Sequence, residues 1–193
     1  MFAIYVTHPQ VRIDPTIPVP QWGLSERGVE RARLAAESGW ARRLGRVVSS
    51  DETKAIETAN ILADGRPVEV LADFGENDRS ATGFLAPDAF EKAADWFFAN
   101  PEQSFSGWER AVDAQARIVA AVSRALETHD PSVPIAFIGH GGVGTLLKCH
   151  LAGVPIARLD QQPGGGNLFA FSLADRSLAC DWTPIELWQG WQA

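Results

Sequence analysis

The sequence predicts an α/β fold: a three-layer α/β/α sandwich with a mostly parallel sheet. Helical segments alternate with short apolar runs, which favours parallel strands joined by crossover helices that cover both faces of the sheet. Two further runs flank Asp175-Arg176 and indicate an antiparallel hairpin at the edge of the sheet near the C-terminus. The apolar runs that read as buried strands are residues 1–6, 46–50, 68–71 and 135–139, followed by the hairpin runs 168–173 and 178–182.

Five segments between and after these runs have the apolar spacing or end signals of helices. The first follows Ser25, a favoured N-cap residue. Asp51 is the expected N-cap of the second helix, and Pro87 suits the first turn of the third. Steps of four and three between apolar residues predict a long amphipathic helix over 108–126, and the fifth helix is expected over 142–152.

The length and composition favour one domain over residues 1–193. The chain has 193 residues, 46% of them hydrophobic, which is enough to close a single core. We find no internal repeat, linker or low-complexity tract. The least regular stretch, 73–105, is expected to form a small helical insertion or lid over one edge of the sheet.

The charge balance argues against nucleic-acid binding, because a net charge of −7 repels phosphate polyanions over the whole surface. An anionic small substrate therefore needs a local positive pocket. No apolar stretch approaches the ~20 residues that span a bilayer, and the N-terminus lacks the basic and apolar parts of a secretion signal. We expect a cytoplasmic protein that binds neither membrane nor nucleic acid.

Two pairs of residues bear on cofactors and oligomers. Cys149 and Cys180 lie far apart in sequence without a Cys-x-x-Cys neighbour, so reduced thiols are favoured over a disulfide or a metal pair. Trp188 and Trp191 are expected to cover the edge of the fold or to contact a second subunit, which leaves a homodimer open.

Polar side chains follow the predicted strands at the point where each strand ends. His8 follows the first strand, Ser49-Ser50 close the second, Glu76 comes shortly after the third, and His140 directly follows the fourth. Ligands of open α/β sheets bind outside the carboxyl ends of the strands. We therefore expect these groups to meet at one rim of the sheet.

The surroundings of His140 and Lys54 add to this expectation without settling it. Glycines flank His140 and lead into a helix, so backbone N–H groups could close around an anion, although a plain glycine turn is the alternative. Lys54 lies in the first turn of its helix, where a cation opposes the macrodipole by ~0.3–1 kcal/mol. Lys54 either binds phosphate or is a solvated lysine neutralised by Asp51, Glu52 and Glu57.

Five stretches, in this order, resemble the histidine phosphatase superfamily, also called the phosphoglycerate mutase-like family. They read THP, LSERG, SSDETKAIETA, GENDRS and IGHGG, and the resemblance covers nearly the whole chain. It implies a phosphoglycerate mutase-like fold and a small phosphorylated substrate, or inorganic phosphate, as the ligand. It implies no metal and no other cofactor.

The resemblance assigns roles to individual residues. His8 corresponds to the histidine that becomes phosphorylated, and His140 with Gly141 to the second histidine motif. Glu76 resembles the family's proton donor, with Asp73 and Asp78 as alternatives. Partial burial is expected to raise the pKa of Glu76.

Three residues depart from the family's pattern. Thr7 stands where the family has a phosphate-binding arginine, Lys54 replaces a second arginine, and Pro9 replaces a glycine. Lysine keeps the charge but loses the planar fork of arginine, and threonine has no charge. Because one preorganised donor typically contributes about 2.7–4 kcal/mol to a transition state, we expect reduced activity.

Other residues of the same motifs could restore part of the lost binding. Arg12 and Arg79 lie close in sequence to His8 and Glu76 and could reach the pocket, although surface exposure is the alternative for both. Thr7 and Gly141 are candidate phosphate contacts beside Lys54, and the further candidate substrate contacts are Asn77 and Trp22.

The leading hypothesis is a metal-independent phosphomonoesterase that works through phosphorylated His8 on an unidentified small substrate. Its alternative is a catalytically impaired relative that binds a phosphorylated ligand or a protein. A phosphoglycerate mutase is less favoured, because the segment 84–98 offers few basic groups for a second anionic substituent.

Overall fold

The computed structural model describes residues 1–158, 162 and 164–190. Its sheet has the strand order β3-β2-β4-β1-β5-β6. The four strands β3, β2, β4 and β1 pair in parallel, whereas β5 is antiparallel to both β1 and β6. The strands are β1 (Phe2–Thr7), β2 (Arg46–Ser49), β3 (Glu69–Val70), β4 (Ile135–Gly139), β5 (Asn167–Ser172) and β6 (Leu178–Pro184).

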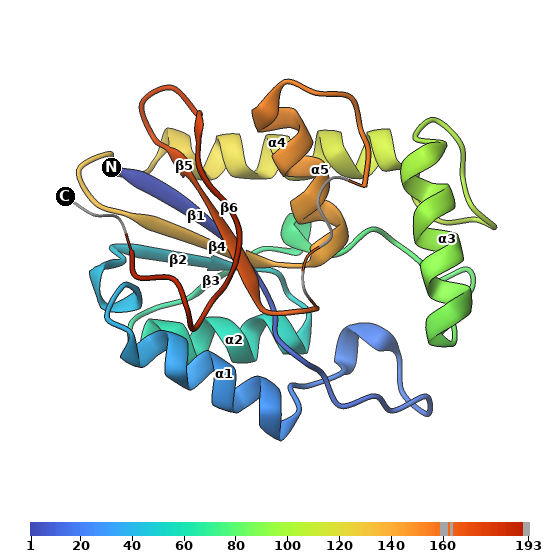
Figure 1. Ribbon diagram of the computed structural model, residues 1–193, viewed down its shortest axis with the longest axis horizontal. Helices are drawn as coiled ribbons and strands as arrows, with labels where there is room; N and C mark the ends of the chain where they lie inside the picture. Colours follow the sequence, from blue (N-terminus) through green and yellow to red (C-terminus); the bar gives the residue numbers. More distant parts are fainter. Residues whose placement is uncertain (159–161, 163, 191–193) are drawn as a thin grey trace.

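Helices cover both faces of the sheet, as the sequence predicts. In Figure 1, α1 and α2 lie below the sheet and α4 and α5 lie above it, while α3 stands to the right, apart from the sheet. The helices are α1 (Glu26–Glu37), α2 (Thr53–Ala63), α3 (Pro87–Ala99), α4 (Ala111–Glu127) and α5 (Gly141–Ala152). The predicted three-layer architecture with an antiparallel C-terminal edge is confirmed.

The central strand β1 supplies both cores through the alternation of its side chains. Ile4 and Val6 belong to the cluster that contains residues of α1 and α2. Ala3 and Tyr5 belong to the cluster that contains residues of α4 and α5. Both faces of β1 are therefore buried, which is why its sequence reads as a continuous apolar run.

Several predicted boundaries are confirmed and three local predictions are wrong. Ser25 caps α1 by accepting the N–H of Gly28, and Pro87 is the first residue of α3. The third strand is not buried: both of its residues are exposed, because β3 is an edge strand that pairs only with β2. The long amphipathic helix α4 begins at Ala111, so Trp108 lies before the helix although it packs into the same core.

The predicted N-cap of α2 is also wrong. The chain stays extended through Glu52, which is the N-cap, whereas Asp51 was expected in that position. The hydroxyl of Ser50 accepts the N–H of Glu52 at 3.1 Å, which holds the extended turn that precedes the helix. The Glu52 side chain makes no capping hydrogen bond to α2.

The C-terminal edge is closed by aromatic packing. Trp188 packs edge-to-face against Trp40, with ring centroids 5.4 Å apart. This contact agrees with the expectation that Trp188 covers the edge of the fold. Trp191, for which the same role was predicted, lies outside the described residues. None of the helices in the described part of the chain is long and apolar enough to cross a membrane.

Gly144 of α5 leaves the space that the Tyr5 ring occupies. A Cβ atom on Gly144 would lie 2.5 Å from Cε1 of Tyr5, whose side chain is fully buried. We therefore expect Gly144→Ala to lower the free energy of unfolding by about 1–3 kcal/mol, the usual cost of overpacking a core. Urea denaturation measures this, with His150→Ala on the exposed face of α5 as the control. Equal stabilities of Gly144→Ala and the parent would contradict the prediction.

Candidate active site

Two histidines meet where the adjacent strands β1 and β4 end. Thr7 of β1 pairs in register with Gly139 of β4, so the next residues, His8 and His140, leave the sheet side by side. The N–H of His8 also donates to the carbonyl of Gly139 at 3.1 Å. The centroids of the two imidazole rings lie 5.2 Å apart, with the ring planes at 67°. The structure thus brings both histidines together at the rim that the strand ends predicted.

The hydrogen bond of His8 selects its tautomer. Nδ1 of His8 lies 2.8 Å from the carbonyl oxygen of Pro9, which can only accept, so Nδ1 carries the proton. The neutral ring then has its lone pair on Nε2. Burial, with help from the nearby His140 and Lys54, lowers the pKa of His8 to about 3. His8 is therefore a neutral imidazole at physiological pH, with Nε2 available as a nucleophile.

A buried arginine holds the chain behind His8. The N–H of Gly166 donates to the carbonyl of His8 at 2.9 Å. The Arg31 guanidinium donates to the carbonyls of Gly165 at 2.6 Å and Gly166 at 2.9 Å, and it pairs with Glu186 at 2.7 Å. Arg31 thus ties α1 to the turn that supports His8. Sequence reasoning missed this residue, because a charged residue on a helix reads as a surface position.

His140 is buried and fixed through both its ring and its backbone. Its Nε2 lies 2.9 Å from the Ser50 hydroxyl and 3.4 Å from Oε1 of Glu52. Its Nδ1 has no hydrogen-bond partner among the described residues. Burial lowers the pKa of His140, although Glu52 and Glu76 act in the opposite direction. Burial thus favours the neutral form of this ring, whereas the two carboxylates favour its protonated form.

Tyr5 explains part of the glycine pattern around His140. Its hydroxyl accepts the N–H of His140 at 3.1 Å and donates to the His140 carbonyl at 3.2 Å. A Cβ on Gly139 would lie 2.3 Å from this hydroxyl, so the glycine makes room for Tyr5. Burial raises the pKa of Tyr5. The spacing of Gly139 and Gly144 was the sequence signal that a large side chain lies against this segment.

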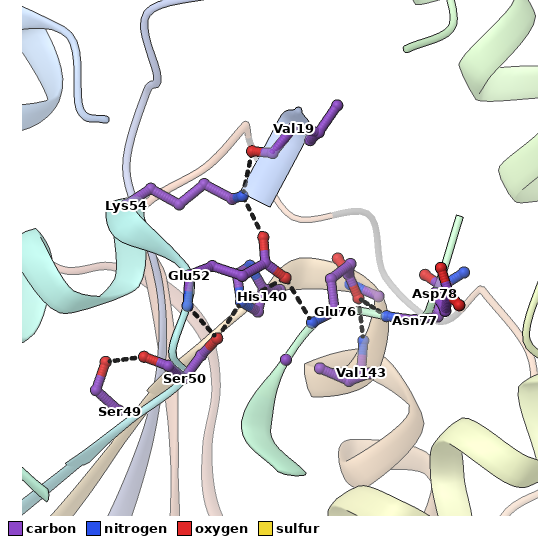
Figure 2. A network of polar contacts seen from close by, with 12 residues as sticks. Val19, Ser49, Ser50, Glu52, Lys54, Glu76, Asn77, Asp78, His140 and Val143 are labelled. Carbon is purple, nitrogen blue, oxygen red and sulfur yellow. Dashed lines mark hydrogen bonds and ion pairs between the residues drawn. The ribbon is translucent and has the colours of Figure 1, made fainter. Parts of the chain in front are cut away.

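Glu76 occupies the N-terminus of α5 (Figure 2). Its carboxylate accepts the N–H groups of Gly142 and Val143, each at 3.0 Å, and of Asn77 at 3.1 Å. A Cβ on Gly142 would lie 2.6 Å from Glu76 Oε1, so this glycine makes room for the carboxylate. Asn77 is buried, and its Nδ2 has no hydrogen-bond partner within the described ranges.

The predicted direction of the Glu76 pKa shift is wrong. Burial does raise the pKa of Glu76, but His140, Arg79 and the two N–H groups of α5 outweigh burial. The pKa therefore lies below its usual value, and Glu76 is a carboxylate in the free protein. The sequence showed the burial but not the helix N-terminus that receives the side chain.

Lys54 is buried and already has partners. Its Nζ donates to the carbonyl of Val19, in the short 3-10 helix Val19–Gln21, at 3.0 Å and forms an ion pair with Glu52 (Figure 2). Glu52 also accepts the N–H of Glu76 at 3.0 Å. Burial raises the pKa of Glu52, but His140 and Lys54 outweigh it and lower the pKa to about 2. Sequence reasoning treated Glu52 only as a neighbour that neutralises a solvated Lys54.

Arg79 lies against an aromatic platform beside the site. Its guanidinium carbon is 4.9 Å from the ring centroid of Phe90 and 5.7 Å from that of Trp108. Burial lowers the pKa of His140, and the Arg79 charge lowers it further. Burial raises the pKa of Glu76, and the Arg79 charge is one of the influences that outweigh burial there. The Arg79 guanidinium therefore acts electrostatically on both Glu76 and His140.

The remaining candidates from the first loop are placed differently. Trp22 is buried, donates from Nε1 to the carbonyl of Asp14 at 2.8 Å, and packs on Phe84 with centroids 5.5 Å apart. Arg12 is exposed. The hydrogen bonds from Thr16 are the main cause of the lowered pKa of Asp14, and the Arg12 charge makes a smaller contribution. Among the described residues, no contact joins Arg12 to His8 or His140.

The model of one protein family matches most of this chain. The match is to the histidine phosphatase superfamily, branch 1, over residues 16–172. The chain belongs to the histidine phosphatase superfamily. The matched span begins after His8, so the histidine phosphatase assignment rests on the chain from the first loop to β5. A search of curated proteins finds no match.

Solved structures of histidine phosphatase fold align with nearly the whole chain. Bacillus stearothermophilus YhfR is 20% identical, with 92% of this chain and 93% of that chain covered and a TM-score of 0.77. The mycobacterial glucosyl-3-phosphoglycerate phosphatase complexed with VO3 is 24% identical, with 89% and 92% covered and a TM-score of 0.71. A mutant phosphoserine phosphatase of Entamoeba histolytica, in complex with phosphoserine, is 15% identical, with 97% and 99% covered and a TM-score of 0.69.

The side chain of Thr7 is bound into the fold. Its hydroxyl accepts the N–H of Asn167 at 3.0 Å and lies 3.2 Å from both the Asn167 carbonyl and Oε1 of Gln162. Thr7 is 1% exposed. Gly141, the other backbone candidate for phosphate, is the first residue of α5, and its carbonyl accepts Nε2 of Gln162 at 3.2 Å.

The described part of this histidine phosphatase contains no candidate metal site. No group of three or more His, Cys, Asp or Glu side chains there is placed to hold a metal ion. Cys149 and Cys180 are both free thiols, as the sequence predicts. Cys149 is buried, and its Sγ lies 3.4 Å from the carbonyl of Ala157.

The neutral state of His8 predicts how stability depends on pH. The folded pKa, about 3, lies below the ordinary 6.5, so the unfolded chain takes up the proton first as the pH falls. Stability that His8 contributes above about pH 6.5 is therefore lost toward pH 3. Because the ring is partly exposed, we expect His8 to account for about 2 kcal/mol of unfolding free energy lost between about pH 7 and pH 4.

Urea denaturation of the parent and of His8→Gln across this pH range measures the effect. Glutamine does not titrate, so the stability difference between the two proteins should shift toward the variant by that amount as the pH falls. A difference that stays constant with pH would show that His8 titrates in the fold as it does in the unfolded chain.

Proposed function

We propose that this protein is a metal-independent phosphomonoester hydrolase that acts through a phosphohistidine intermediate on His8. The observation that carries the proposal is a neutral imidazole whose Nδ1 is held by the Pro9 carbonyl, with the ring of His140 at 5.2 Å. The substrate is a small phosphorylated compound, and inorganic phosphate is the product. Membership of the family and the phosphatases among its structural relatives support the reaction class.

In the first step, the lone pair of His8 Nε2 attacks phosphorus in line with the leaving group. The N–P bond forms, the P–O bond to the leaving group breaks, and the leaving oxygen takes a proton from Glu76. Glu76 is ionised in the free protein, so it needs to acquire that proton when substrate binds. A negatively charged phosphoryl group nearby raises the pKa of a carboxylate, which favours this protonation.

In the second step, water attacks the phosphohistidine. Glu76, now a carboxylate, takes a proton from the water, the N–P bond breaks, and His8 returns with its lone pair on Nε2. We assign to His140 and Lys54 the stabilisation of the charge on the transferring phosphoryl oxygens, with Gly141 and Arg79 as further contacts. We also propose that segment 73–105, which contains α3, acts as a lid. The cytoplasmic location stays a prediction from the sequence.

A second candidate function is a catalytically impaired member of the fold that binds a phosphorylated ligand. Two contacts favour it: the Thr7 hydroxyl is bonded to Asn167, and the Lys54 ammonium is bonded to Glu52 and Val19. The Thr7 hydroxyl and the Lys54 ammonium are therefore already engaged within the fold, and a phosphoryl group would have to compete for them. The two candidates differ in turnover and not in ligand chemistry.

The test of hydrolysis is trapping of the intermediate with a panel of phosphorus-labelled small phosphomonoesters. We expect an acid-labile adduct on His8 and release of inorganic phosphate, because a phosphorus–nitrogen bond to imidazole hydrolyses in acid. His8→Ala should abolish both signals. His150→Ala, at an exposed position of α5, is the matched control and should leave both unchanged.

The outcomes separate the two functions. Turnover that survives His8→Ala would exclude His8 as the nucleophile. Binding of inorganic phosphate by calorimetry, with no adduct and no turnover on any ester of the panel, would favour the impaired relative. If the protein neither binds inorganic phosphate nor turns over any ester, both proposals are overturned.

A further inference from the structure

Glu52 is an acidic side chain inside the candidate site to which neither the family pattern nor the proposed reaction gives a task. It is the N-cap residue of α2, yet its carboxylate does not cap that helix. Figure 2 shows the side chain between Lys54 and His140, close to the backbone of Glu76. Its side chain is 11% exposed.

Both carboxylate oxygens of Glu52 are engaged by residues of the site. One oxygen forms the ion pair with Lys54. The other accepts the N–H of Glu76 at 3.0 Å and lies 3.4 Å from Nε2 of His140. A buried carboxylate with an ammonium partner and a backbone donor is ionised, which agrees with the lowered pKa. The site therefore contains a permanent anion of its own.

This anion cancels the charge that Lys54 would offer to a ligand. The Lys54 ammonium has two acceptors in the fold, Glu52 and the Val19 carbonyl, and the Lys54 side chain is 4% exposed. The charges that act most strongly on His140 are the carboxylates Glu52 and Glu76 and the cations Lys54 and Arg79. These four charges sum to zero, so a doubly charged phosphoryl group would enter a site with no excess of positive charge.

We propose that Glu52 is a specificity-determining residue whose carboxylate competes with the phosphoryl group of the ligand for Lys54, and so disfavours doubly charged phosphoryl groups relative to singly charged ones. The inference rests on the proposed function in one respect, namely that the ligand's phosphoryl group binds in this site. It does not depend on turnover. In this role Glu52 weakens the binding of the phosphoryl group, whereas a Glu52 that orients Lys54 toward the ligand would strengthen it.

Two probes that differ by one methyl group and one charge test the competition by calorimetry. Phenylphosphonate carries two negative charges at about pH 8.5, well above the second pKa of a phosphoryl group, ≈ 6, whereas its monomethyl ester carries one. Glu52→Gln keeps the length of the side chain and an oxygen for the N–H of Glu76. We expect Glu52→Gln to bind phenylphosphonate about 10- to 100-fold more tightly than the parent, the range of one hydrogen bond to a charged group, and to gain less for the monoester.

A double-mutant cycle with Lys54 separates competition from a simple loss of negative charge. In the Lys54→Gln background, Glu52→Gln should no longer improve the binding of phenylphosphonate, because no ammonium is released. Glu30→Gln, which removes one carboxylate at an exposed position of α1, should leave both affinities unchanged. Thermal melting checks the fold of each variant, and Glu52→Met is used if Glu52→Gln unfolds near the assay temperature.

Four results would overturn the inference. They are weaker binding of phenylphosphonate by the Glu52 variant, an equal gain for both probes, a gain that persists without Lys54, and no detectable binding by any variant. The trapping of phosphohistidine with labelled esters tests the hydrolase proposal independently of these affinities. If the affinities change as expected and no adduct forms on His8, the role of Glu52 stands and the hydrolase proposal fails.

Discussion

The parallel pairing of β1 with β4 is the constraint on which the rest of the site depends. Because Thr7 and Gly139 are partners in that ladder, the two histidines leave the sheet at the same level and cannot separate without breaking it. The hydrogen bond from the His8 N–H to the Gly139 carbonyl extends the ladder by one residue into the site. The two imidazoles thus come from segments far apart in sequence, but the sheet fixes their separation.

The segment around His140 shows how one set of glycines serves several neighbours. Gly139 and Gly144 leave space for Tyr5, and Gly142 leaves space for Glu76. The Tyr5 hydroxyl in turn hydrogen-bonds both the N–H and the carbonyl of His140. The glycine-rich run therefore brings His140 and Glu76 together at one helix N-terminus through packing, and the backbone N–H groups of Gly142 and Val143 bind Glu76 in the free protein.

The sequence predicted the layers, most element boundaries and the meeting of His8 with His140, because apolar periodicity and strand ends are local signals. It could not predict the pKa direction of Glu76, which depends on the N-terminus of α5, a segment about 65 residues away in the chain. It also missed Arg31 and Glu52. Arg31 lies in the middle of α1 and Glu52 at the N-cap of α2; charged residues at such positions are usually exposed, and only the tertiary fold buries these two.

Thr7 and Lys54, the two side chains expected to contact phosphate, share one feature. In each case the polar atom that would meet a phosphoryl group is satisfied inside the fold, by Asn167 for Thr7 and by Glu52 for Lys54. Placing arginine at position 7 would therefore do more than add a charge: it would leave the N–H of Asn167 without its acceptor, in a position that is 1% exposed. Removing the Glu52 charge, by contrast, breaks the ion pair of a cation that is already in the site and leaves the contacts of Thr7 in place.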